Sequence, residues 1–374
     1  MATGWPMKTT YANGDVYSAS DVNDITGTIN LLGSSVAYTA GKNRFINADF
    51  RYNQRSFTST TTDLVYGFDR WQMSVSGGTC TYSAQTFTPG TAPVAGYEAI
   101  NFARLVTASQ TLSSHYAYLG QRIEDARTFA GQTVTISFWA KAASGTPSVG
   151  VTFYRSFGTG GSPSANEYAV SAGQKTAITT SWARYSLTFA INSVSGKTFG
   201  TTANTSWITP FIWTSAGTDY NTQSGSLGLQ NVTIDFWGIQ VEVGSTATAF
   251  QTATGTIQGE LAACQRYYFR SSAGSSQTVA FGGNIPTTAI TVYNSQFPVT
   301  MRSTPAFSSG TAASITVGHG ANVNTVANSI TADVQSVNFS QWYITVSGTP
   351  FTVGGASRCY STASTGWVEF SAEL

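Results

Sequence analysis

The segment GQTVTISFWAKAASG, residues 131–145, alternates between two kinds of side chain, as a β-strand does when its two faces meet different surroundings. One face is apolar and consists of Val134, Ile136, Phe138 and Ala140. The other face carries Thr133, Thr135, Ser137, Trp139 and Lys141. Trp139 therefore lies on a hydroxyl-rich face. Three interpretations are open: its ring is a platform for a ligand, it is covered by a loop or a second subunit, or it is simply exposed.

Strand-like segments of this kind recur along most of the chain, without helices between them. The clearest are residues 132–141, 181–191, 206–215 and 231–243, followed by 287–294, 314–320 and 341–348. Such a succession predicts an all-β protein built from antiparallel sandwiches. We expect a jelly-roll β-sandwich at 41–252 and a second, smaller β-sandwich domain at 272–374. The Gly- and Ser-rich residues 155–176 are interpreted as a mobile loop or an ordered arm.

Helical patterns occur in two places. The first lies in an N-terminal segment, residues 1–40, where a short helix over 18–33 carries apolar residues at heptad spacing: Val22, Ile25, Ile29, Leu32 and Val36. So short a helix is unstable alone, so the spacing favours self-association, most simply as a homotrimer. The alternative is one short helix packed on its own domain. The second pattern predicts a connecting helix at 253–271.

Composition excludes several classes of partner. Charged residues make up 9% of the 374 residues and the formal net charge is +1, without a basic run that would indicate nucleic-acid binding. No apolar stretch reaches the roughly 20 residues that span a bilayer, so no membrane insertion is expected. No secretory signal is evident at the start, and three widely spaced cysteines are interpreted as free buried thiols.

Groups that commonly carry catalysis are scarce. The chain has two histidines, His115 and His319, and no G-x-S-x-G motif, so we expect neither an enzyme nor a cofactor. A glycosidase needs only a suitable pair of carboxylates, which a sequence alone does not exclude. A glycan depolymerase therefore stays open as an alternative.

Aromatic residues on the predicted strands are the best candidates for ligand binding. Alternation places Trp207, Phe211 and Trp213 on one face of 206–215, and it places Trp237 with Asp235 and Ile239 on one face of 232–240. Flat rings suit the C–H faces of sugars. The candidate ligand-binding residues are Trp139, Tyr154, Trp207, Trp213 and Trp237. Only one face of each sheet in a sandwich meets the core, so the opposite face holds a ligand groove, a loop or a neighbouring subunit. For Trp139 we favour cover by a loop or subunit.

Several segments together resemble bacteriophage tail-fibre and related virion structural proteins that carry a carbohydrate-binding-module-like jelly roll. They include YANGDVYSASDVND (11–24), NRFINADFRYNQR (43–55), YLGQRIEDARTFAGQTVTISFWAKA (118–142) and ELAACQRYY (260–268). The resemblance implies a virion protein that is made in the host bacterial cytoplasm, contacts other virion proteins and contributes to host surface glycan binding. The alternative is a head or tail decoration protein without glycan affinity.

One departure from the related jelly rolls concerns a structural calcium ion. A glutamate that often ligates calcium there is replaced by Arg51, and Ala48 replaces a glycine. Asp49 and Asp235 still offer carboxylate oxygens, which suit a hard cation. Because the guanidinium of Arg51 opposes an ion, we favour a different role for Asp49, which is to cap a turn or to pair with an arginine such as Arg51 or Arg70.

Overall fold

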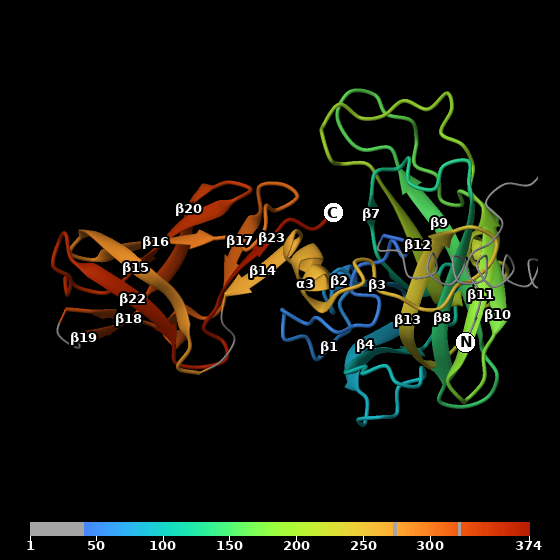
Figure 1. The fold of residues 1–374 in the computed structure, drawn as a ribbon, viewed down its shortest axis with the longest axis horizontal. Helices are drawn as coiled ribbons and strands as arrows, with labels where there is room; N and C mark the ends of the chain where they lie inside the picture. Colours follow the sequence, from blue (N-terminus) through green and yellow to red (C-terminus); the bar gives the residue numbers. More distant parts are fainter. Residues whose placement is uncertain (1–40, 272–274, 321–322) are drawn as a thin grey trace, which may run out of the picture.

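A computed structural model of the chain describes residues 41–271, 275–320 and 323–374, which form antiparallel sheets with a few short helices (Figure 1). The predicted all-β class is thereby confirmed. The helix predicted at 18–33 and its heptad positions Val22, Ile25, Ile29, Leu32 and Val36 lie outside the described residues. None of the described helices is long and apolar enough to cross a membrane.

The first part of the chain forms a sandwich of two sheets, here named sheet A and sheet B. Sheet A has the strand order β1 (Ser59–Thr60), β4 (Thr79–Thr86), β5 (Asn101–Ala108), β13 (Thr233–Val243), β8 (Thr133–Ala142) and β11 (Ala183–Ala190). Sheet B has the order β10 (Gln174–Ala177), β9 (Ser148–Ser156), β12 (Trp207–Ala216), β6 (Tyr116–Gly120), β3 (Gln72–Ser76) and β2 (Val65–Tyr66). The short strand β7 (Ile123–Glu124) pairs with β12. Two short helices, η1 (Thr218–Tyr220) and α2 (Asn221–Ser224), follow β12 in the chain.

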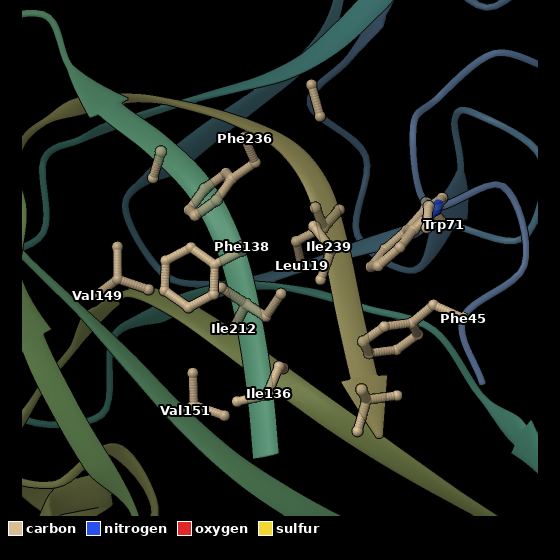
Figure 2. Packing of buried hydrophobic residues seen from close by; sticks show 14 of the residues in the cluster. Phe45, Trp71, Leu119, Ile136, Phe138, Val149, Val151, Ile212, Phe236 and Ile239 are labelled. Atoms are coloured by element: carbon tan, nitrogen blue, oxygen red, sulfur yellow. The ribbon is translucent and has the colours of Figure 1, made fainter. Parts of the chain in front are cut away.

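The core between the two sheets is made by the apolar faces that alternation predicts. In Figure 2, Ile136 and Phe138 of β8 point toward Val151 of β9 and Ile212 of β12, and all four side chains are fully buried. Burial of one such side chain stabilises the fold by about 1.5–3 kcal/mol. The apolar positions of β8 therefore fix which face of sheet A turns inward.

A β-bulge in β13 changes which residues share a face. Gly238 adopts φ +59°, a left-handed conformation that suits glycine, and the register with β8 shifts between Trp237 and Gln240. Ile239 is consequently buried in the core, near Leu119 in Figure 2. The prediction that Ile239 shares a face with Trp237 is therefore wrong, because strict alternation does not hold across a bulge.

The outer face of sheet A is covered by the chain itself. Residues 244–252, which follow β13, are anchored there because Glu242 accepts hydrogen bonds from the Thr248 backbone N–H (2.9 Å) and hydroxyl (2.7 Å). Arg184 on β11 donates to the Thr248 carbonyl and to the Ser137 hydroxyl. This face of the sheet is therefore closed by a loop.

The connecting helix is shorter than predicted. Helix α3 spans Ile257–Gln265, and the Thr256 hydroxyl caps it by accepting from the Gly259 N–H at 3.0 Å. Tyr268, which we expected on the helix, belongs to strand β14 (Tyr268–Ser271), whose backbone pairs with β23. The helix ends early because these backbone groups are needed in a sheet.

The last part of the chain forms a second core between a three-stranded and a seven-stranded sheet. The small sheet has the order β14, β23 (Val368–Ser371) and β17 (Ala306–Ser309). The larger sheet has the order β19 (Val323–Val326), β18 (Ile315–His319), β22 (Ala356–Ser361), β15 (Thr278–Thr287), β16 (Ile290–Gln296), β21 (Phe339–Thr345) and β20 (Ser329–Gln335). Helix η2 (Ala312–Ser314) precedes β18. Trp342 and Tyr293 stack at the centre of this core, with ring centroids 5.0 Å apart.

Ion pairs join this second part to the first sandwich. The Glu373 carboxylate, close to the end of β23, binds Arg55 (3.0 Å) and the buried Arg70. The Arg70 guanidinium also lies over the Tyr267 ring, 3.5 Å from its centroid. The chain after β23 therefore returns to sheet B, next to β7.

Candidate functional site

A groove of about 330 Å³ lies on the outer face of sheet B. Its floor comes from alternate residues of two neighbouring strands, Tyr116, Tyr118 and Gly120 of β6 and Trp207, Thr209, Phe211 and Trp213 of β12. Tyr154 of β9 and Gln72 of β3 extend the floor on either side. These side chains face away from the core because the residues between them, such as Leu119 and Ile212, face inward.

Aromatic rings form a continuous row along this groove. The rings of Tyr118 and Phe211 stack with centroids 4.0 Å apart and planes at 24°, and Tyr154 follows 5.6 Å from Phe211. Trp207 ends the row, 5.0 Å from Tyr154. These three steps between ring centroids make the row at most about 15 Å long. A row of this length offers contacts to an extended chain rather than to one small molecule.

Gly120 keeps the middle of the groove open. A Cβ atom at this position would lie 3.1 Å from Thr209 Cγ2 and 3.2 Å from Phe211 Cδ1. Both distances are tighter than ordinary van der Waals contact, and a longer side chain would rise into the groove. The absence of a side chain at Gly120 therefore deepens the groove between the lining residues of β6 and those of β12.

Three residues that line the groove have buried polar atoms without a hydrogen-bond partner in the described part of the chain. They are Thr209 (Oγ1), Trp213 (Nε1) and Gln223 (Oε1). An unsatisfied buried polar atom costs about 1–3 kcal/mol, and few occur in folded proteins. Three beside one groove point to a ligand that carries both donors and acceptors.

The ionisable groups of the groove are few. Arg122 is the one charged side chain among the described residues that line it, and its guanidinium carbon lies 4.6 Å from the centroid of the Trp207 ring. Burial raises the pKa of the Tyr118 hydroxyl. The phenol therefore stays protonated and can donate a hydrogen bond. No pair of carboxylates of the kind that a glycosidase uses lines this groove in the described residues.

The structure brings three of the five predicted ligand-binding residues together. Tyr154, Trp207 and Trp213 all line the groove. Trp213 is only 3% exposed, because it packs against Tyr118 and Tyr220 with ring centroids 5.0 Å and 5.8 Å away. Its ring faces are therefore largely covered by its neighbours, and its indole N–H is buried without a hydrogen-bond partner in the described residues.

Trp139 and Trp237, the other two predicted ligand-binding residues, lie on the other sheet and do not line this groove. They are paired across β8 and β13 on the outer face of sheet A. Trp237 is fully buried under Tyr97 and Phe250, whose ring centroids are 5.1 Å and 5.0 Å away. Phe250 and Trp139 both lie close to Gly238. Trp139 is half-buried on this face, next to the loop that carries Phe250.

The two predicted calcium ligands each face cations. Asp235 binds both Arg104 (2.6 and 2.9 Å) and Lys141 (3.6 Å), so its two oxygens are occupied. Asp49 binds Arg51 at 3.3 Å and accepts from the Tyr97 hydroxyl at 3.0 Å. No group of three or more metal-ligating side chains occurs in the described residues. The carboxylates therefore do not fit a calcium ion, and the preferred pairing of Asp49 with Arg51 is confirmed.

Several groove residues were missed by the sequence analysis. They are Tyr116, Tyr118, Tyr168, Tyr220, Gln72 and Gln223, together with Arg122. The alternation in YAYLGQR, residues 116–122, does signal a strand with an aromatic outer face. The other residues come from loops and the short helix α2, where no local pattern marks them.

Comparison with known proteins supports a binding role for this region. Residues 110–207 match the family model described as "Carbohydrate binding domain". The matched segment contains β6, β9 and the first residue of β12, which supply much of the groove. This part of the chain is thus similar to a carbohydrate-binding domain, which supports glycan binding. No curated protein matches the chain.

The solved structures that are similar to the chain include the following three. One, titled "CBM4 structure and function", is 18% identical, with 53% of this chain and 98% of that chain covered and a TM-score of 0.28. A putative sugar binding protein from Bacteroides thetaiotaomicron is 14% identical (54% and 100% covered, TM-score 0.35). The enzymatically active domain of bacteriophage CBA120 tailspike protein 4 is 13% identical (54% and 22% covered, TM-score 0.30). Likenesses this distant carry neither a ligand nor a biological role over to this chain.

Proposed function

We propose that this chain is a structural adhesion subunit of a bacteriophage virion appendage, such as a tail fibre, and that its groove binds a host surface glycan. The aromatic row from Tyr118 to Trp207, beside three unsatisfied buried polar atoms, carries the glycan-binding part of the proposal. Rings cover the C–H faces of sugars, and polar atoms pair with their hydroxyls. The virion part rests on the resemblance of segments such as 11–24 and 260–268 to phage tail proteins.

Assembly as a homotrimer would compensate for the weakness of a single groove. A shallow site that lacks a metal ligand set binds one short glycan only weakly, whereas three linked sites on one polymer gain affinity from their high effective concentration. The heptad positions between Val22 and Val36 supply the trimer contact in this proposal. Other proteins of the virion are the remaining partners in this proposal.

The experiment compares two tryptophan substitutions in the full chain. Trp207→Ala removes the ring that ends the aromatic row, whereas Trp139→Ala removes a ring that is covered on the other sheet. We expect Trp207→Ala to weaken binding to an array of bacterial surface polysaccharides about fivefold, since one stacked ring contributes about 1 kcal/mol. Trp139→Ala should lower the melting temperature but leave the binding of the folded protein unchanged.

The outcomes separate the alternatives. Equal binding by the parent protein and Trp207→Ala contradicts the assignment of the groove. A blank array for the parent protein, at concentrations where trimers are intact, favours a purely structural head or tail decoration protein. Release of new reducing ends from a polysaccharide over multiple turnovers establishes a depolymerase and contradicts the proposal.

A further inference from the structure

The aromatic row of the groove ends at a positive charge. Arg122 continues the alternation of Tyr116, Tyr118 and Gly120, so its side chain leaves sheet B on the same face as theirs. Its guanidinium carbon lies 4.6 Å from the centroid of the Trp207 ring. A sugar that contacts Trp207 therefore lies within reach of the guanidinium.

Most of the N–H donors of Arg122 have no partner among the described residues. Nη1 donates to the backbone oxygen of Leu374, the last residue in the sequence, and this contact holds the side chain in place. Nε and Nη2 have no hydrogen-bond partner among the described residues, and no side-chain carboxylate there pairs with this arginine. Nε–H and Nη2–H form the side-on fork that binds both oxygens of one carboxylate.

The carboxylates near this end of the groove already have cationic partners. Glu124, on the strand next to Trp207, binds Arg266 through both oxygens (3.1 and 3.0 Å) and accepts from the Tyr267 hydroxyl. These partners lower the pKa of Glu124 despite its partial burial, which opposes the shift. Glu373 binds two other arginines. Neither acid is therefore available to neutralise Arg122.

A further cation strengthens the asymmetry. Arg302 donates only to backbone carbonyls, those of Asn204, Ala372 and Glu373, and forms no ion pair within the described residues. Toward the opposite end of the groove, two acids directly precede lining residues: Asp219 precedes Tyr220 and accepts from the Ser113 hydroxyl at 3.2 Å, and Asp63 precedes Leu64 and accepts from the Ser74 hydroxyl at 2.7 Å. The groove is thus positive at the Trp207 end and negative near Tyr220.

We propose, on the basis of the function proposed above, that the groove selects an acidic glycan and that Arg122 binds the carboxylate of a uronic-acid-type sugar. The planar guanidinium fork matches a carboxylate in shape and charge. The ring of that sugar lies beside Trp207, and the neighbouring sugars run along Tyr154, Phe211 and Tyr118. The charge asymmetry orients the glycan, with its acidic unit at the Arg122 end.

The test uses ligands that differ only in the carboxylate. Polygalacturonate, alginate and hyaluronan are each prepared in native and carboxyl-reduced form, and binding to the full chain is measured by titration calorimetry. We expect carboxyl reduction to weaken binding at least tenfold, because a charge-assisted pair of hydrogen bonds is lost. Raising the salt concentration should weaken binding of the native form alone.

Arginine variants assign the effect to one residue. Arg122→Gln should bind native and carboxyl-reduced polymer equally, and Arg122→Lys should retain part of the preference as a point charge. Arg127→Gln is the matched control, because Arg127 is exposed and pairs with Asp125 outside the groove. The ligand comparison needs no substitution, so it decides the matter even if Arg122→Gln destabilises the fold.

The results distinguish this inference from the proposal on which it rests. Binding that is unaffected by carboxyl reduction and by Arg122→Gln, but is weakened by Trp207→Ala, overturns the acidic preference and keeps the glycan-binding groove. A preference for neutral polysaccharides likewise overturns the acidic preference and keeps the glycan-binding groove. Absence of binding to acidic and neutral polymers alike, on this panel and on the array, rejects the groove itself.

Discussion

A buried ion pair beside the groove leads to a sharp prediction about stability. Arg155 at the end of β9 is fully buried, and its guanidinium binds one Glu167 oxygen through Nε (2.8 Å) and Nη2 (2.5 Å). Nη1 donates to the Asn192 carbonyl at 3.0 Å, so the same side chain holds a second loop. Lys197 binds the other Glu167 oxygen at 2.6 Å from a more exposed position. These contacts make an ordered arm of residues 155–176.

The expected cost of Glu167→Gln follows from this geometry. Removing one partner of a buried ion pair typically costs 3–5 kcal/mol, because the other charge stays buried. Arg155 keeps its carbonyl partner and Glu167 is 21% exposed, so the lower end applies, about 3 kcal/mol. For a unit of this size, that loss lowers the melting temperature by roughly 6–12 °C. Lys197→Met, which removes a partner that is 34% exposed, should cost about 1 kcal/mol or less.

The pH dependence gives a second test of the same pair. Although partial burial opposes it, hydrogen bonding from Lys197 and Arg155 lowers the pKa of Glu167 below its ordinary value of 4.5. Because the folded state holds the proton less tightly, this stabilisation is complete above pH 4.5 and is lost as the pH falls through the folded-state pKa. The difference between the parent protein and Glu167→Gln should therefore be constant from neutral pH to about pH 5 and shrink below about pH 4.

Thermal and urea unfolding of the three proteins between pH 3 and pH 7 measure these differences. Equal destabilisation by Glu167→Gln and Lys197→Met would show that Arg155 does not depend on Glu167. A Glu167→Gln deficit at pH 3 as large as at pH 7 would show that the lost interaction is not ionic. Either result refutes the account of the arm.

Two further predictions concern the thiols and the assembly. Burial raises the pKa of Cys80 and of Cys359 to about 12, and it also raises the pKa of Cys264 well above its ordinary value. A thiol reagent at pH 8 should therefore modify none of the three cysteines in the native protein and all three after denaturation. Fast modification of the native protein would contradict their buried placement. Deletion of residues 1–36 should reduce the particle mass measured by light scattering from three chains to one, and an intact protein that is already monomeric would reject the coiled-coil interpretation.

The sequence predicted strands well where both faces repeat over many residues. Residues 132–141 and 206–215 became β8 and β12 within a residue or two, since each alternates over most of its length. Prediction failed at Ile239, where a glycine bulge shifts the register, and at Tyr268, where pairing with a distant strand replaces the helix. Both failures come from contacts between residues far apart in the chain, which a local pattern does not contain.

The candidate site shows the same limit more clearly. Trp139 and Trp207 have similar surroundings in the sequence, each on the polar or aromatic side of an alternating strand. One is covered and the other lines a groove because residues 244–252 return over sheet A and no described segment closes over the middle of sheet B. Which of the two tryptophans lines a groove therefore depends on the path of a loop more than 100 residues after Trp139.

An uncovered aromatic face normally makes a soluble protein prone to associate, so its persistence on sheet B needs a physical reason. Here the rings largely cover one another: Tyr118 stacks on Phe211 at 4.0 Å, and Trp213 is almost fully buried by its neighbours. Beside the exposed Tyr168 and Leu64, the lining presents tyrosine hydroxyls, glutamine amides and one guanidinium. A purely apolar partner gains little from such a surface, whereas a hydrated, hydroxyl-rich chain gains both ring contacts and hydrogen bonds. The mutual stacking thus both keeps the free groove soluble and favours a sugar-like ligand over a protein.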